Sequence, residues 1–192
     1  MNTSIRCLLM IGILSLNSTH VYSQEKEYKN DKYVIVLDVQ QYWTGKTLSE
    51  KAAEEMLASI NALIDKTDPS KIIYVKSIAR VASLSFKGVK IDTVPNQDFD
   101  PALRIVNNTV FMKDEGDAFT ASELTSFLSK NNVKEIILTG LLAEECVSRT
   151  AIGGLSRNYA VYIIPEAVGA KSEKSKKKSL EKLSKAGVIL LN

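Results

Sequence analysis

Short runs of consecutive apolar residues alternate along this chain with longer segments whose apolar residues recur at helical spacing. The runs are typical of strands buried on both faces of a sheet, and the longer segments of amphipathic helices. We expect strands over residues 33–38, 71–76, 109–113, 135–140, 159–165 and 188–191. We expect helices over residues 48–65, 120–130, 144–157 and 172–185, the second of them capped by Thr120.

Strands that alternate with helices form βαβ units with right-handed crossovers. The pattern therefore predicts an α/β chain with a three-layer, Rossmann-like fold, in which about six mostly parallel strands carry helices on both faces. Residues 77–108 interrupt the alternation. There we expect a short hairpin around Lys87-Gly88 and a single helical turn over residues 97–103.

The first residues are typical of a secretory signal peptide. One positive charge within residues 1–6 precedes an uncharged, mostly apolar run over residues 7–16, and Val21-Tyr22-Ser23 fits a cleavage site. We expect a signal peptide over residues 1–23, a polar leader over 24–32 and one domain over 33–192. The apolar run is too short for a stable membrane anchor, so we expect a periplasmic or secreted protein. The alternative is an N-terminal anchor that stays uncut.

Export changes the chemistry available to the chain. The formal net charge is +3, and loss of Arg6 brings it closer to neutrality, which gives no support for a nucleic-acid partner. The only histidine, His20, and one of the two cysteines, Cys7, lie in the expected signal peptide. The remaining chain has Cys146 alone, so zinc sites built from His and Cys and intrachain disulfides are excluded.

Three chemically active side chains follow three of the expected strands. Asp38 ends the first, Lys113 ends the third, and Cys146 follows the fourth. Groups at the carboxyl ends of the strands line one crevice in an open α/β sheet, so we expect an acid, an ammonium and a thiol to converge. A thiol at the start of a helix feels the positive end of the helix dipole, which predicts a lowered pKa for Cys146.

Each of these residues also has a structural interpretation. Cys146 can be a small core residue, Asp38 can cap the next segment, and Lys113 can be a solvated strand end. Glu144 and Glu145 are interpreted as first-turn acids that complement the helix dipole and reach solvent, rather than as catalytic carboxylates. Their charges oppose thiolate formation at Cys146.

The order of these motifs resembles that of the isochorismatase-like cysteine hydrolases, which include nicotinamidases and N-carbamoyl amidases. The motifs are Asp38-x-Gln40, then Lys113 followed by Asp-Ala-Phe at 117–119, then Gly140-Leu-Leu-Ala-Glu-Glu-Cys146-Val147. The resemblance covers nearly all of the chain after the leader. It implies that Cys146 is the nucleophile, that Asp38 takes the thiol proton and later activates water, and that Lys113 stabilises the thiolate.

The resemblance also implies a cis peptide just before Ala143, which aims the backbone N–H groups of Ala143 and Cys146 at a developing oxyanion. Tyr42 and Trp43 lie close to Asp38 and either line the mouth of the pocket or pack under a loop. The residues expected around the substrate are Gln40, Tyr42, Trp43, Phe119 and Leu142.

Nicotinamidases place a metal-binding Asp and His residues after the second strand, where this chain has Ser77-Ile-Ala-Arg80. We therefore expect no metal and no cofactor. The expected function is an exported hydrolase that cleaves an amide or ureido C–N bond of a small molecule, and the family implies a homo-oligomer. One alternative is a catalytically silent binding protein on the same fold. The other is a haloacid-dehalogenase-type phosphatase with Asp38 as nucleophile and Thr139 in support, although Gln40 stands where its general acid is needed.

Overall fold

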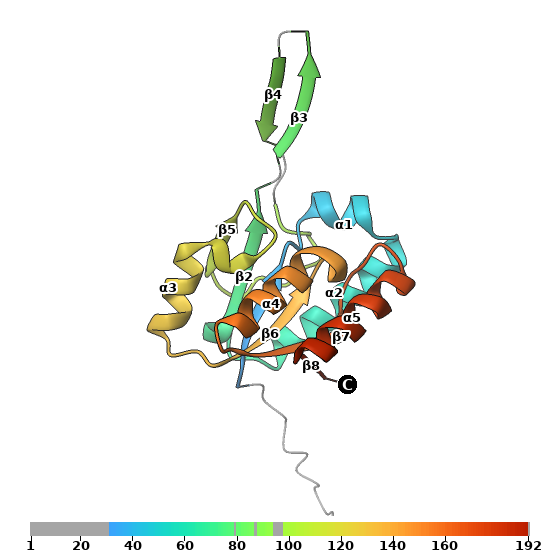
Figure 1. The fold of residues 1–192 in the computed structure, drawn as a ribbon. Helices are drawn as coiled ribbons and strands as arrows, with labels where there is room; N and C mark the ends of the chain where they lie inside the picture. The colour runs from blue at the N-terminus through green and yellow to red at the C-terminus, as the bar shows by residue number, and fades with distance from the viewer. Residues whose placement is uncertain (1–30, 79, 87, 94–97, 192) are drawn as a thin grey trace, which may run out of the picture.

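In the computed structural model, residues 31–78, 80–86, 88–93 and 98–191 are described (Figure 1). The expected signal peptide and most of the polar leader lie outside these residues. Six strands form one parallel sheet in the order β5-β2-β1-β6-β7-β8. They are β1 (Tyr33–Leu37), β2 (Ile72–Ser77), β5 (Val110–Lys113), β6 (Glu135–Gly140), β7 (Ala160–Val168) and β8 (Ile189–Leu190). The predicted sheet is thus confirmed, with strand ends within about three residues of the expected ones.

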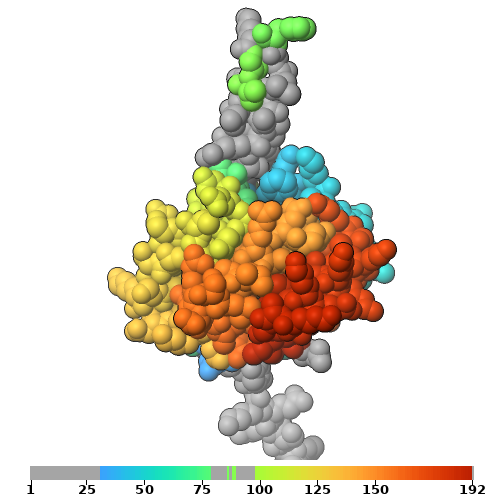
Figure 2. All heavy atoms as spheres, viewed as in Figure 1, coloured from blue at the N-terminus to red at the C-terminus, as the bar shows by residue number. Residues whose placement is uncertain are grey.

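Helices cover both faces of the sheet, as the α/β prediction requires. They are α1 (Gln41–Thr47), α2 (Glu50–Asp65), α3 (Ser122–Lys130), α4 (Ser148–Ser156) and α5 (Glu173–Ala186). Figure 2 shows α3, α4 and α5 side by side on one face of the molecule. Helix α2 packs on the opposite face of the sheet, where its buried side chains join a second core cluster.

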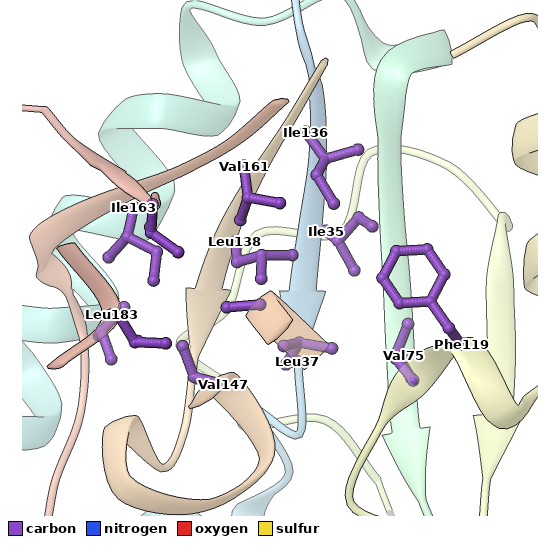
Figure 3. Close-up of a cluster of buried hydrophobic side chains, with 14 of the residues drawn as sticks. Ile35, Leu37, Val75, Phe119, Ile136, Leu138, Val147, Val161, Ile163 and Leu183 are labelled. Carbon is purple, nitrogen blue, oxygen red and sulfur yellow. The ribbon is translucent and has the colours of Figure 1, made fainter. Parts of the chain in front are cut away.

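The central strands explain why the apolar runs are continuous. In β1, Ile35 and Leu37 point into the core under α3, α4 and α5, whereas Val34 and Val36 point into the core under α2. Both pairs are fully buried, and burial of each such side chain contributes about 1.5–3 kcal/mol. Figure 3 shows the first core, in which side chains from the neighbouring strands interlock. The sheet is therefore a rigid base whose strand ends are fixed in position.

The predicted hairpin is present as β3 (Arg80–Ser85) and β4 (Gly88–Thr93), which pair antiparallel in a separate two-stranded sheet. It stands away from the body on the side where β2 ends (Figure 1). Lys87, in the predicted turn, lies outside the described residues. Among the described residues, no helix combines the length and apolar character needed to cross a membrane.

Two local predictions are wrong. Residues 98–103 form no helical turn; Phe99 instead makes an isolated bridge with Gln40, and a turn follows. Thr120 does not cap α3, because its hydroxyl donates to the carbonyl of Asp117 (2.7 Å) within a 3-10 turn, Ala118–Thr120. Helix α3 begins after that turn, at Ser122.

The segment around Cys146 also differs from the regular helix that we expected. A single π-helical turn, Ala143–Val147, precedes α4. Cys146 lies inside this turn, near its end, and α4 begins only at Ser148. The thiol is therefore not at the first residue of an α-helix, which weakens the reason for expecting a lowered pKa.

Candidate active site

The carboxyl ends of adjacent parallel strands meet at one edge of the sheet and bring the candidate residues together. Asp38 directly follows β1, Ser77 and Lys113 are the last residues of β2 and β5, and Cys146 follows β6. Ser77 and Lys113 are partners in the β2–β5 register. The structure thus places the three residues expected from the sequence, Asp38, Lys113 and Cys146, in one cluster with a serine that was not expected.

The backbone turns sharply where β1 and β6 end. Asp38 has a φ of 57°, a left-handed conformation that only some non-glycine residues adopt readily. Gly140 has a φ of 104°, and a Cβ at this position would overlap the carbonyl oxygen of Leu37. Glycine at 140 therefore lets the segment that carries Cys146 pass directly beside the end of β1.

The Lys113 ammonium is at the centre of the cluster. Its Nζ lies 2.9 Å from Oδ2 of Asp38 and donates hydrogen bonds to Cys146 Sγ (3.3 Å), Ser77 Oγ (2.7 Å) and the carbonyl of Glu115 (3.0 Å). The side chains of Lys113 and Asp38 are 0% and 5% exposed. Two charges removed from water to this extent are tolerated only because they face each other, since an unpaired charge there would be costly.

The carboxylate of Asp38 is asymmetric. Its Oδ1 accepts a hydrogen bond from Ser77 Oγ at 2.8 Å. Its Oδ2 is buried and accepts no hydrogen bond from the described residues, although it lies 2.9 Å from the ammonium nitrogen of Lys113. Oδ1 is therefore held by a hydrogen bond, while Oδ2 interacts with Lys113 only as the partner of an ion pair.

The environment of Cys146 acts against ionisation. Burial, and after it the negative charge of Asp38, raise the pKa of the thiol to about 11, because the opposing effect of Lys113 does not offset them. The expected lowering of the pKa is therefore wrong for this structure. The physical cause is loss of hydration around a half-buried sulfur that lies next to an anion.

The two glutamates beside the thiol are engaged with α5 and its N-terminal flank. Oε1 of Glu144 accepts from the N–H of Lys171 (3.0 Å) and from Ser175 Oγ (3.2 Å), and Glu145 forms an ion pair with Lys171. The expectation that both reach solvent is wrong for Glu144, which is half-buried. These contacts attach the π-helical turn to the start of α5.

A pocket of about 170 Å³ opens onto the cluster. Trp43, Leu141 and Leu142 supply apolar lining, and the ion pair of Glu145 and Lys171 supplies charged lining. The complete lining among the described residues is Asp38, Trp43, Thr47, Ser77, Leu141, Leu142, Glu145, Cys146 and Lys171. Trp43 and Leu142 are thus placed in the pocket wall, as expected.

Three other expected pocket residues lie elsewhere. Phe119 is 3% exposed and stacks on Tyr159 in the core, where Figure 3 shows it facing the other apolar side chains. Gln40 is buried, and its side-chain amide bonds to the backbone N–H and carbonyl of Ser77 (2.8 and 3.2 Å). Tyr42 packs edge-on against the Trp43 ring and accepts a hydrogen bond from Lys46, outside the pocket lining.

The expected oxyanion donors also need correction by one residue. The cis peptide joins Leu141 and Leu142, rather than preceding Ala143. The N–H of Ala143 donates to the carbonyl of Gly169 (2.8 Å) and is therefore engaged. The N–H of Leu142, by contrast, donates to none of the described residues.

The sequence interpretation missed several residues of the site, chiefly Ser77 and Lys171. Both lie at the carboxyl end of a strand, as Asp38, Lys113 and Cys146 do. Ser77 ends β2, and Lys171 follows the carboxyl end of β7. Within the described parts of the chain, no group of three or more His, Cys, Asp or Glu side chains is arranged to hold a metal ion.

Comparison with known proteins gives independent evidence on the family of this chain. Residues 32–192 match the family model of the isochorismatase domain. The isochorismatase family protein 2A of Dictyostelium discoideum is 36% identical over 86 residues, or 44% of this chain and 42% of that protein. The match therefore spans less than half of that relative's length. The secreted isochorismatase effector Isc1 of Verticillium dahliae is 26% identical over 142 residues, covering 72% of this chain and 73% of the relative.

A solved structure shows the same fold at low sequence identity. The pyrazinamidase of Pyrococcus horikoshii, solved in complex with zinc, superposes with a TM-score of 0.65 at 19% identity. The superposition covers 85% of this chain and 99% of that chain. At this identity the likeness concerns the fold alone.

Proposed function

The chain belongs to the isochorismatase family, and we propose that it is an exported, metal-independent cysteine hydrolase that cleaves the C–N bond of a small amide or ureido compound. The observation that carries this proposal is the buried contact of one ammonium with both a carboxylate (2.9 Å) and a thiol (3.3 Å). A nucleophile, a base and a charge stabiliser within hydrogen-bond reach are what nucleophilic catalysis requires.

The reaction begins from the neutral thiol and the Asp38–Lys113 ion pair. Asp38 takes the thiol proton as Sγ of Cys146 attacks the carbonyl carbon, and a tetrahedral oxyanion forms. The C–N bond then breaks, Asp38 returns the proton to the leaving nitrogen, and an acyl-thioester remains on Cys146. Water activated by Asp38 attacks the thioester, which releases the acid and restores the thiol.

The raised pKa of Cys146 fits a base-assisted attack rather than attack by a standing thiolate. With a pKa of about 11, little thiolate exists near neutral pH, so the proton must leave as the carbon–sulfur bond forms. The Lys113 charge stabilises the negative charge that develops on sulfur during this step.

The backbone N–H groups of Leu142 and Cys146 are the proposed oxyanion donors. The N–H of Ala143 is engaged with Gly169, whereas Leu142 lies in the pocket wall and its N–H has no acceptor among the described residues. A well-placed donor of this kind contributes about 3–4 kcal/mol to the transition state.

The lining of the pocket favours a small, uncharged substrate. The only cation in the described lining, Lys171, is paired with Glu145, and the lining carboxylate of Asp38 is paired with Lys113 behind it, so the described lining offers no unpaired cation to a substrate carboxylate. Trp43 and the two leucines suit a flat apolar group beside the scissile amide. The pyrazinamidase neighbour suggests carboxamides as starting compounds.

Export is supported by the signal-like residues 1–23 and by a relative that is itself named as a secreted effector. The phosphatase alternative is not supported, because the chain belongs to another family and Thr139 is buried in β6 beside the carbonyl of Ile35. The remaining alternative is a silent binding protein.

A panel of uncharged carboxamides and ureido compounds tests the proposal, with ammonia release and acid formation as readouts. We expect at least one compound to be hydrolysed, the activity to be lost in Cys146→Ala, and intact mass to show an acyl adduct on the wild-type protein. A compound that binds the wild type without turnover or adduct would instead identify a binding protein. Turnover that persists in Cys146→Ala would exclude Cys146 as the nucleophile.

A further inference from the structure

We propose that Ser77 is a positioning residue, which keeps one oxygen of Asp38 free to accept the proton of Cys146. This inference rests on the proposed cysteine hydrolase function, and it assigns a task to a residue that was not expected in the site. It is carried by the number of hydrogen bonds that Lys113 can donate and by where they go.

A lysine ammonium has three N–H donors. Lys113 Nζ donates to Ser77 Oγ (2.7 Å), to the carbonyl of Glu115 (3.0 Å) and to Cys146 Sγ (3.3 Å). These three bonds use all of its protons. The fourth neighbour, Oδ2 of Asp38, lies 2.9 Å from the nitrogen but accepts no hydrogen bond from the described residues.

The two oxygens of Asp38 consequently differ in their capacity to act as a base. Ser77 Oγ donates to Oδ1 at 2.8 Å, so that oxygen is already stabilised by a donor. Oδ2 has no hydrogen-bond donor among the described residues and lies 2.9 Å from the ammonium nitrogen, so its lone pairs are left for the thiol. Oδ2 is therefore the oxygen that receives the proton.

Ser77 is itself held firmly in place. Its backbone N–H donates to Oε1 of Gln40 (2.8 Å) and its carbonyl accepts from Nε2 of the same side chain (3.2 Å). Its hydroxyl accepts from Lys113 and donates its single proton to Asp38, which fixes the orientation of the O–H bond. The buried Gln40 thereby supports the site through Ser77.

Removal of the hydroxyl frees one N–H of Lys113, and the nearest remaining acceptor is Oδ2 of Asp38. In Ser77→Ala we expect this N–H to donate to Oδ2, which makes that oxygen a weaker acceptor for the thiol proton. kcat should then fall about 10- to 100-fold, within the range attributed to general-base catalysis, while KM changes little. The ionisation midpoint of the thiol should move down from about 11, because an Asp38 carboxylate that accepts a hydrogen bond from Lys113 opposes thiolate formation less strongly.

The test is a pH titration of the Cys146 thiolate, followed by ultraviolet absorbance and by the rate of iodoacetamide alkylation. It compares the wild type with Ser77→Ala and with Ser77→Thr, which keeps a hydroxyl and should restore both midpoint and kcat. The matched control is Ser156→Ala, which removes a hydrogen bond to Gly153 (2.9 Å) at the opposite end of α4 and should leave the midpoint unchanged.

The titration needs no substrate, so it separates this inference from the proposed function. A downward shift in Ser77→Ala supports the positioning role even if no tested compound is hydrolysed, in which case only the hydrolase proposal fails. An unchanged midpoint in Ser77→Ala, together with a loss of kcat no larger than that of Ser156→Ala, would overturn the inference. Failure of Ser77→Thr to restore the midpoint would also count against it.

Discussion

At Cys146, two neighbouring charges of opposite sign act on the same sulfur. Asp38 raises the pKa of the thiol through its charge, whereas Lys113 lowers it. Burial is the largest effect and acts in the same direction as Asp38, so the sulfur stays protonated near neutral pH. The immediate surroundings of Cys146 thus determine when its sulfur becomes reactive.

Substitution of the two charged partners should move the thiol midpoint in opposite directions. Lys113→Met removes the stabilising cation, so the midpoint should rise above about 11 and alkylation near neutral pH should slow. Asp38→Asn removes the anion, so the midpoint should fall and alkylation should accelerate. Each shift should be about one pH unit or more, and both variants should lose turnover.

Alkylation rates measured across pH provide the check, and thermal melts identify any unfolded variant. Lys113→Met leaves Asp38 buried without its partner, so a lowered melting temperature is expected for it. Midpoints that move in the same direction in both variants would contradict the assignment of opposite roles to these two residues.

At the scale of elements, two glycines share a positive φ, but their replacement by alanine should cost different amounts of stability. Gly140 (φ 104°) ends β6 where a Cβ would overlap the backbone of Leu37, while Gly187 (φ 111°) ends α5 with a Cβ position 4.0 Å from the nearest atom. Gly187→Ala should cost only the conformational penalty, about 1–2 kcal/mol. Gly140→Ala should cost clearly more, because β1 and β6 must also separate.

Denaturant unfolding of both variants measures these two costs directly. Gly187→Ala is the matched control, since it carries the strained φ without the overlap. Equal unfolding free energies for the two variants would show that the close approach of β6 to Leu37 has little energetic weight.

The elements themselves were largely predictable from the sequence. Continuous apolar runs such as Val34–Leu37 are buried on both faces, which only a central parallel strand explains, so the sheet follows from the pattern. The same strand-end rule located Asp38, Lys113 and Cys146. It applies equally to Ser77, but a serine has no distinctive chemistry until its partners are known.

The local errors have a common physical cause, which is tertiary contact. Phe119 ends the Asp-Ala-Phe motif and was expected in the pocket, yet its N–H donates to Asp117 (2.9 Å) at a 3-10 turn and its ring lies in the core. The engaged N–H of Ala143 depends on the carbonyl of Gly169, which is distant in sequence. The pKa of Cys146 depends on burial that no local pattern specifies.

For the molecule as a whole, the chemistry should not require a metal. We expect chelating agents to leave activity unchanged, because the chain after residue 23 contains no histidine and no acidic cluster arranged for a cation was found among the described residues. Turnover measured before and after treatment with EDTA provides the check. Loss of activity that a divalent cation restores would contradict this prediction.

The N-terminal segment should be absent from the exported protein. The charged start, the apolar run and Val21-Tyr22-Ser23 predict processing after Ser23. The intact mass of protein recovered outside the cytoplasm is the appropriate measurement. A mass that retains residues 1–23 would indicate a tethered form, and size-exclusion with light scattering on the same sample tests the predicted homo-oligomer.

Burial of the thiol has a further consequence that bears on the proposed export of the protein. Peroxides and small disulfides react with thiolate, not with thiol. With a pKa of about 11, only about one Cys146 in 10,000 is ionised at pH 7, against roughly 3% for a free cysteine. We therefore expect the Cys146 thiol to be slow to oxidise or to form mixed disulfides, so that the proposed nucleophile survives in an oxidising compartment.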